Sequence, residues 1–204
     1  MKIISDFESG NGKNIKEIEK NHFQLETFGE SSSYAGYFCF KVINEDKEDI
    51  ECKIDVFLDR DIEYTELDRQ GFLNSQPPLW FNIDGVWRKT FDYEKENLML
   101  HIKLTVPSEK EVIVTSMVPL LYNEFTNELK ERLSENTIGR YYEIGNSFEG
   151  RPIVLVSIGN PEAEKHILVI SGLHGTEFPG IWAAKGIIDF LLSDSSEAKE
   201  LRNR

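Results

Sequence analysis

Strand periodicity is clearest in the stretch Ile50-Glu51-Cys52-Lys53-Ile54-Asp55-Val56-Phe57-Leu58. Every even-numbered position in it is apolar, and the odd-numbered positions are mostly charged. Because successive side chains point to opposite faces of a strand, this pattern predicts a strand with one buried face. The residues from Leu98 to Val106 repeat the alternation, so a second strand of the same kind is expected there.

Further short strands are expected around these two. The candidates are Phe23 to Phe28, Tyr37 to Ile43, Glu111 to Met117, and a hairpin from Trp80 to Trp87 that turns at Asp84-Gly85. Many short strands with turn residues between them, and hardly a helix, favour an antiparallel β-sandwich over residues 1–120. Cys39 and Cys52 both lie inside strand-like runs, and we expect them to be buried free thiols.

Charge and composition exclude several classes of function. The chain has 204 residues, with 23 Lys and Arg against 36 Asp and Glu, which gives a formal net charge of −13. An acidic surface repels nucleic acid and anionic membranes, so neither is an expected partner. The sequence contains no apolar run of the roughly 18 residues that cross a bilayer, and its first residues lack the apolar region of a signal peptide. A cytoplasmic location is therefore expected.

The periodicity changes after Pro119. The segment from Tyr122 to Leu133 places Phe125, Leu129 and Leu133 on one helical face, which predicts a helix that ends near Gly139. We take residues 121–139 as a connecting helix and turn between the sandwich and a second domain.

Residues 140–204 have the pattern of an α/β domain. The expected elements are a strand at Ile153 to Ile158, a turn at Gly159-Asn160-Pro161, a buried strand at His166 to Ser171, and a helix from Pro179 to Leu192. A last helix is expected to begin at Asp194, which has capping-box spacing to Glu197. With at most three strands, the predicted sheet has an open edge.

Potential metal ligands lie in Ser171-Gly172-Leu173-His174-Gly175-Thr176-Glu177-Phe178-Pro179-Gly180, where the predicted strand ends and the helix begins. Ligands bind at this end of the strands in open α/β sheets. An imidazole and a carboxylate three residues apart can bind one Zn²⁺, so His174 and Glu177 are the candidate metal ligands. On spacing alone, a polar loop residue and an acid at a helix N-terminus are the favoured interpretation, because His-x-x-Glu is a short pattern with many chance matches.

The wider context of the motif resembles a known enzyme family. The stretch Glu143-Ile144-Gly145-Asn146-Ser147-Phe148-Glu149-Gly150-Arg151-Pro152-Ile153, followed by Gly172 to Glu177, resembles the opening of the catalytic domain of M14-type zinc carboxypeptidases. Asp6 to Asn11, the tryptophan hairpin and the helix after Pro119 resemble the β-sandwich domain of the cytosolic carboxypeptidase branch. The resemblance implies a mixed β and α/β protein, in which the sandwich precedes the first part of a carboxypeptidase domain.

The resemblance also implies a chemistry. Members of the family are zinc metallopeptidases that hydrolyse C-terminal peptide or isopeptide bonds, so the implied substrate is the C-terminus of a peptide or protein. The family's third zinc ligand is a later histidine, its substrate carboxylate is bound by arginines, and a late glutamate is the general base. Among the four histidines, His22, His101, His166 and His174, none follows the motif. We therefore expect these 204 residues alone to be an inactive fragment, and we assign no catalytic residue.

Two alternatives remain open. A zinc-dependent amidohydrolase of the desuccinylase or aspartoacylase kind has a loop much like Gly172 to Glu177. A non-catalytic β-sandwich binding module is the second, and an aromatic platform of Trp80, Trp87 and Tyr93 is its candidate surface. The sequence leaves the oligomeric state and the residue removed from the substrate undetermined.

Overall fold

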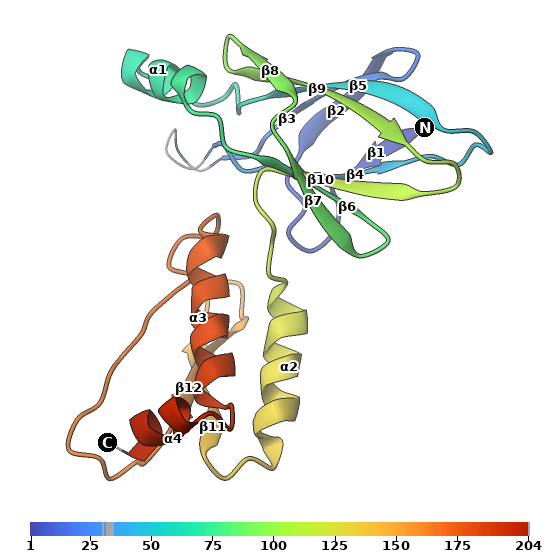
Figure 1. Cartoon of the computed structure of the whole chain (residues 1–204). Helices are drawn as coiled ribbons and strands as arrows, with labels where there is room; N and C mark the ends of the chain where they lie inside the picture. Colours follow the sequence, from blue (N-terminus) through green and yellow to red (C-terminus); the bar gives the residue numbers. More distant parts are fainter. Residues whose placement is uncertain (30, 32–34, 204) are drawn as a thin grey trace. The chain divides into compact units, whose positions relative to one another are not determined.

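The computed structural model describes residues 1–29, 31 and 35–203 (Figure 1). The chain divides into two compact units, Met1–Pro119 and Leu120–Arg204. The first is built almost wholly of strands, and the second combines helices with a strand pair. Within the described ranges, every helix is too short or too polar to cross a lipid bilayer.

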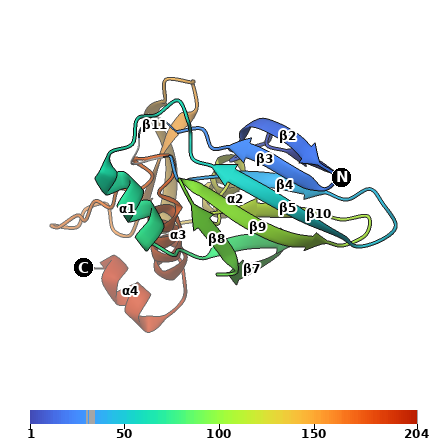
Figure 2. The same ribbon diagram turned by 90° about the horizontal axis from the view of Figure 1, so that it is seen from above.

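Over its described residues, the first unit consists of two five-stranded sheets. One sheet has the strand order β1-β4-β10-β6-β7, and the other has the order β2-β3-β5-β9-β8, which Figure 2 shows from above. The strands of the first sheet are β1 (Lys2–Ile4), β4 (Cys39–Ile43), β6 (Leu79–Ile83), β7 (Val86–Thr90) and β10 (Glu111–Thr115). Those of the second are β2 (Lys13–Glu19), β3 (His22–Glu26), β5 (Ile50–Phe57), β8 (Tyr93–Glu96) and β9 (Met99–Val106).

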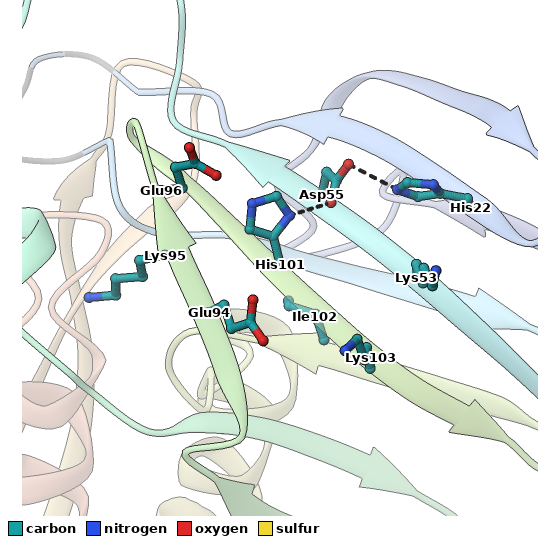
Figure 3. A pocket seen from close by; sticks show the side chains of 9 residues that line it. All are labelled: His22, Lys53, Asp55, Glu94, Lys95, Glu96, His101, Ile102 and Lys103. Atoms are coloured by element: carbon teal, nitrogen blue, oxygen red, sulfur yellow. Dashed lines mark hydrogen bonds and ion pairs between the residues drawn. The ribbon is translucent and has the colours of Figure 1, made fainter.

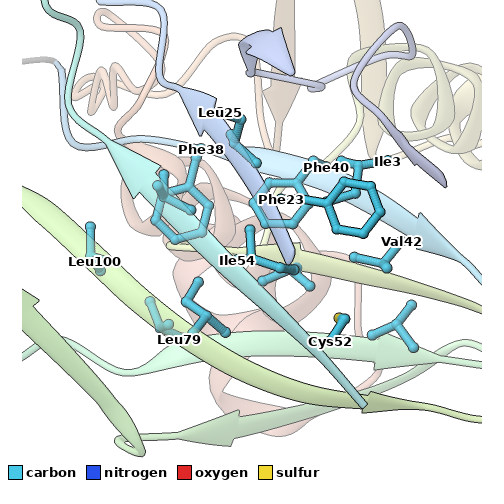
Figure 4. Packing of buried hydrophobic residues seen from close by; sticks show 14 of the residues in the cluster. Ile3, Phe23, Leu25, Phe38, Phe40, Val42, Cys52, Ile54, Leu79 and Leu100 are labelled. Carbon is cyan, nitrogen blue, oxygen red and sulfur yellow. The ribbon is translucent and has the colours of Figure 1, made fainter. Parts of the chain in front are cut away.

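One hydrophobic core lies between these sheets and draws residues from both (Figure 4). Phe40 and Val42 of β4 face Phe23, Leu25 and Ile54 of the second sheet in the same buried cluster. The alternation expected in β5 is confirmed, because Cys52, Ile54 and Val56 are buried while Glu51 and Lys53 are exposed. The two thiols are also as expected. Both cysteines are free and buried, and burial raises the pKa of the Cys52 thiol to about 12.

The sandwich differs from the expectation in two respects. Strands β3 and β5 pair in parallel, because the chain crosses to β4 in the other sheet before it returns. A helix, α1 (Glu66–Asn74), also lies between β5 and β6, where we expected none. Thr65 and Asp68 form a capping box at its start. Their three-residue spacing in the sequence could have predicted where this helix begins.

The tryptophan hairpin is confirmed and turns where expected. Strands β6 and β7 pair from Leu79 with Thr90 to Ile83 with Val86, and the two turn residues both have positive φ, 53° at Asp84 and 81° at Gly85. This is the backbone of a two-residue hairpin turn, and glycine adopts it without the steric cost of a side chain.

Replacing Gly85 by alanine is expected to lower the free energy of unfolding by about 1–2 kcal/mol, the cost of placing a Cβ in the left-handed region. Nothing lies within 4 Å of the added Cβ, so the change in the free energy of unfolding reports backbone strain without a steric clash. Urea unfolding followed by circular dichroism tests this. Gly71 of α1 is the control, since Gly71→Ala also enters open space but should stabilise the helix by up to about 1 kcal/mol. Equal unfolding midpoints for Gly85→Ala and wild type would contradict the prediction.

The second unit contains α2 (Tyr122–Ser134), β11 (Gly139–Asn146), β12 (Pro152–Ile158), α3 (Phe178–Leu191) and α4 (Ser196–Asn203). Two expected helix ends are wrong. Helix α2 ends before Gly139, which instead begins β11, where a Cβ would lie 2.6 Å from Leu133 Cδ2. Helix α4 begins after Ser195, whose Oγ accepts a hydrogen bond from Ala198 N, so Asp194 and Glu197 do not form the cap.

The strand expected at His166 to Ser171 is not formed. A strand exists only where its backbone pairs with a neighbour, and no described strand pairs with this segment. Its apolar side chains are exposed as a result, with Ile167 at 91% and Leu168 at 72%. The expected burial of this run is therefore wrong for the described residues, because an apolar run carries no information about whether a neighbouring strand is present to pair with it.

Candidate metal centre

A tight turn at the start of α3 positions the two candidate ligands. Glu177 N donates to His174 O at 3.1 Å, and Gly180 N donates to Glu177 O at 3.2 Å. Gly172 precedes the turn with φ of 70°, a conformation that suits glycine. Pro179 lies in the first turn of α3, where its missing N–H costs no helical hydrogen bond. The side chains of His174 and Glu177 therefore both project from this one turn.

The two side chains meet in this turn. His174 Nδ1 lies 3.0 Å from Glu177 Oε1, and the side chains are 50% and 55% exposed. Glu177 is the N-cap residue of α3, yet its carboxylate makes no capping hydrogen bond to the helix. The carboxylate is therefore directed to the imidazole rather than to the helix backbone.

The donor set and its spacing fit two ligands of one zinc ion. Histidine nitrogen and carboxylate oxygen bind Zn²⁺ at about 2.0–2.2 Å, which places two ligand atoms roughly 3.3–3.6 Å apart in a tetrahedral site. The observed 3.0 Å is a hydrogen-bond distance, a few tenths of an ångström shorter than this range. Within the described part of the chain, no group of three or more His, Cys, Asp or Glu side chains could hold a metal ion. The pair is thus a candidate for part of a ligand set.

The turn between β11 and β12 contains the second stretch that the sequence singled out. Ser147 N donates to Arg151 O at 2.8 Å, and Arg151 N donates to Ser147 Oγ at 3.1 Å, which closes the turn around Gly150. Glu149 pairs with Arg151, and Glu143 pairs with Lys130 at 2.8 Å. Both carboxylates are engaged in exposed ion pairs, so this turn offers no free acid and base pair.

The remaining candidate residues belong to other segments than the turn that holds His174 and Glu177. His22 and His101 belong to β3 and β9 of the first unit, and His166 is exposed in the second. The aromatic platform is incomplete. Trp80 and Trp87 share the outer face of the β6-β7 hairpin, but Tyr93 is buried in the other sheet, with its hydroxyl donating to Pro77 O.

Sequence comparison shows which known proteins the second unit is similar to. The sequence model described as "Peptidase_M14: Zinc carboxypeptidase" matches residues 122–204, which include the His174 and Glu177 turn. The match shows that this part of the chain is similar to zinc carboxypeptidases. A carboxypeptidase relative from Xenopus tropicalis, named cytosolic carboxypeptidase 2, is 32% identical over 95 residues, which are 42% of this chain and 10% of that protein.

Solved carboxypeptidase structures extend the likeness to the whole fold. A metallo-carboxypeptidase from Pseudomonas aeruginosa, in complex with (2-guanidinoethylmercapto)succinic acid, has a TM-score of 0.81 at 22% identity. A metallo-carboxypeptidase from Burkholderia cenocepacia has a TM-score of 0.79 at 18% identity. Each match covers 100% of this chain and 53% of the solved chain. The expected fold class, a β-sandwich with part of a carboxypeptidase domain, is confirmed, and the chain spans about half of these structures.

Proposed function

We propose that this chain supplies His174 and Glu177 as two zinc ligands of a metallocarboxypeptidase that hydrolyses C-terminal peptide or isopeptide bonds. The observation that carries the proposal is the 3.0 Å pair itself, which lies inside the segment that matches the zinc carboxypeptidase family. A bound zinc ion supplies Lewis-acid polarisation of a carbonyl and a water of lowered pKa. The chain's own part is to hold the imidazole and the carboxylate in one turn.

The proposal extends to the domains and to the location in the cell. We propose a sandwich domain over residues 1–120, a connecting segment over 121–139 and the first part of the catalytic domain over 140–204. The substrate is the C-terminus of a peptide or protein. The name of the Xenopus tropicalis relative, a cytosolic carboxypeptidase, supports a cytoplasmic location.

These 204 residues alone are expected to be inactive. Two ligands are fewer than the three protein ligands of a catalytic zinc, and no described group of side chains completes the set. The groups that bind the substrate carboxylate and act as general base are also unassigned. Activity therefore requires a complete carboxypeptidase domain that includes residues 122–204.

A substrate comparison tests the proposed function. The 204-residue chain and a longer protein with a complete domain are each incubated with a peptide, its C-terminally amidated form and an N-acetyl amino acid, with and without a zinc chelator. We expect the longer protein to release the last residue of the free peptide alone, and the chelator to stop this. Release from the N-acetyl amino acid instead would replace the carboxypeptidase by the deacylase alternative. Chelator-sensitive turnover by the short chain would contradict its expected inactivity.

A further inference from the structure

Helix α3 of the second unit directs its charged side chains toward another helix instead of toward water. It contains two charged residues, Lys185 and Asp189. Lys185 Nζ donates to Glu128 Oε1 of α2 at 2.5 Å, and Asp189 forms an ion pair with Arg132 of the same helix. A surface helix normally turns its charged face to solvent and its apolar face to the core. In α3, the charged face is already engaged by α2.

The side of α3 that meets water carries no charge. From residue 181 to the end of the helix, the exposed positions are Trp182, Ala183, Gly186, Ile187 and Phe190. They are spaced by one, three or four residues, so they lie on one stripe of the helix, which we call the α3 stripe. A Cβ added at Gly186 would meet nothing within 4 Å, so the stripe is open at its centre. This is the composition of a face that packs against apolar side chains.

The chain between β12 and α3 exposes a second apolar surface. Residues 167–170 are four consecutive aliphatic residues, each more than half exposed. Figure 1 draws them as part of a long trace without a strand arrow, and no described strand pairs with them. Soluble proteins rarely expose contiguous apolar patches larger than a few hundred Å² unless another surface covers them. Extended backbone without a neighbour also offers its N–H and C=O groups for strand pairing.

The solved carboxypeptidase structures indicate what covers this surface. In the structures from Pseudomonas aeruginosa and Burkholderia cenocepacia, the whole of this chain corresponds to 53% of the solved chain, so just under half of each solved chain lies outside the match. The match to the zinc carboxypeptidase model spans residues 122–204, which include both apolar surfaces. In the first unit, by contrast, the buried core lies between two five-stranded sheets that cover each other.

We propose that the α3 stripe and residues 166–171 are the docking surface for the remaining half of a carboxypeptidase domain. That half supplies apolar side chains to the stripe and a β-strand that pairs with residues 166–171. Because these residues lead directly into the turn of His174 and Glu177, the same pairing also holds the turn from its N-terminal side. The proposal rests on the fold alone and requires neither zinc binding nor hydrolysis.

Thiol labelling of Val169→Cys and Val86→Cys tests the proposal in the 204-residue chain and in a longer protein with a complete carboxypeptidase domain. The two valines are each 54% exposed, and Val86 belongs to β7 of the first unit. Both native cysteines are buried, so their background reaction is slow. We expect similar rates for the two variants in the short chain. In the longer protein, Val169→Cys alone should react at least about tenfold more slowly, since a buried thiol reacts only through local opening.

Amide hydrogen exchange separates strand pairing from simple coverage. The amides of residues 167–170 should exchange more slowly in the longer protein than in the short chain, because paired N–H groups exchange through opening. Ile187→Glu should leave the unfolding midpoint of the short chain unchanged and lower that of the longer protein, where it places a charge in the interface. Leu67→Glu is the control, since Leu67 is exposed on α1 of the first unit and should be neutral in both proteins.

Three outcomes decide the proposal. Equal labelling of Val169→Cys in the two proteins, or unchanged exchange at residues 167–170, would overturn it. Protection that disappears when the longer protein is diluted would assign the surface to a second copy and would also overturn it. Protection that persists in a longer protein without zinc binding or hydrolysis would support the docking surface and refute the proposed function.

Discussion

Replacing His174 by alanine is expected to weaken zinc binding to this chain by about 100-fold. Loss of a group that merely orients a metal ligand already costs about 10–100-fold in affinity, and His174 is proposed as a ligand itself. Glu177 would remain, but a single exposed carboxylate holds zinc weakly because water competes for the ion. A 100-fold loss corresponds to about 2.7 kcal/mol of binding free energy.

Isothermal titration with Zn²⁺ on the wild-type chain and on single variants measures this loss. Glu177→Gln keeps the shape of the side chain and removes its charge, so it should weaken binding to a similar extent. His166→Ala is the matched control, because His166 is an exposed histidine of the same unit outside the turn. Equal losses in His166→Ala and His174→Ala would show that zinc binds any surface imidazole, and the assignment of the pair as ligands would fail.

The proximity of the His174 and Glu177 side chains was predictable from the sequence because it depends on local structure. His174 and Glu177 lie three residues apart on one turn, and Gly172 and Pro179 set the backbone around them. The contacts of Asp55 with His22 and His101 in the first unit (Figure 3) are the opposite case. Alternation placed His22 and His101 on strands, but only the register of β3, β5 and β9 brings both to Asp55. No spacing within the sequence encodes which residues face each other across a sheet.

The same contrast between local and long-range information holds for the fold as a whole. Strands with regular alternation, such as β5 and β9, were predicted to within about two residues of their observed ends, a typical uncertainty for boundaries. The parallel pairing of β3 with β5 was not predicted, because it depends on how the chain crosses between the sheets. The segment from His166 to Ser171 shows that an apolar run alone does not make a strand.

Asp59→Asn is expected to lower the free energy of unfolding of the first unit by about 3 kcal/mol at neutral pH, the size of effect seen when one partner of a buried ion pair is removed. The Asp59 side chain is 3% exposed and accepts from Lys13 Nζ at 2.6 Å. It also accepts from Gly29 N and Asp61 N, each at 3.0 Å. Removing its charge leaves the Lys13 ammonium without its buried partner.

The same carboxylate makes stability depend on pH. Burial opposes ionisation of Asp59, but the hydrogen bonds from Lys13, Gly29 and Asp61 outweigh it, so the folded-state pKa of this carboxyl lies below its ordinary value. Its stabilisation is therefore fully present above the unfolded pKa of about 3.9, and it is lost as the pH falls through the folded value. Asp59→Asn should flatten the decline of stability in acid.

Asp61→Asn is the control that separates burial from proximity. Asp61 contacts the same Lys13 Nζ at the same 2.6 Å, but its side chain is 85% exposed. Water screens an exposed pair, so this variant should change the free energy of unfolding by less than about 1 kcal/mol. Urea unfolding of both variants at neutral and acidic pH measures the difference. Equal losses for the two aspartates would mean that the burial of Asp59 adds nothing, because the lysine and the distance are common to both pairs.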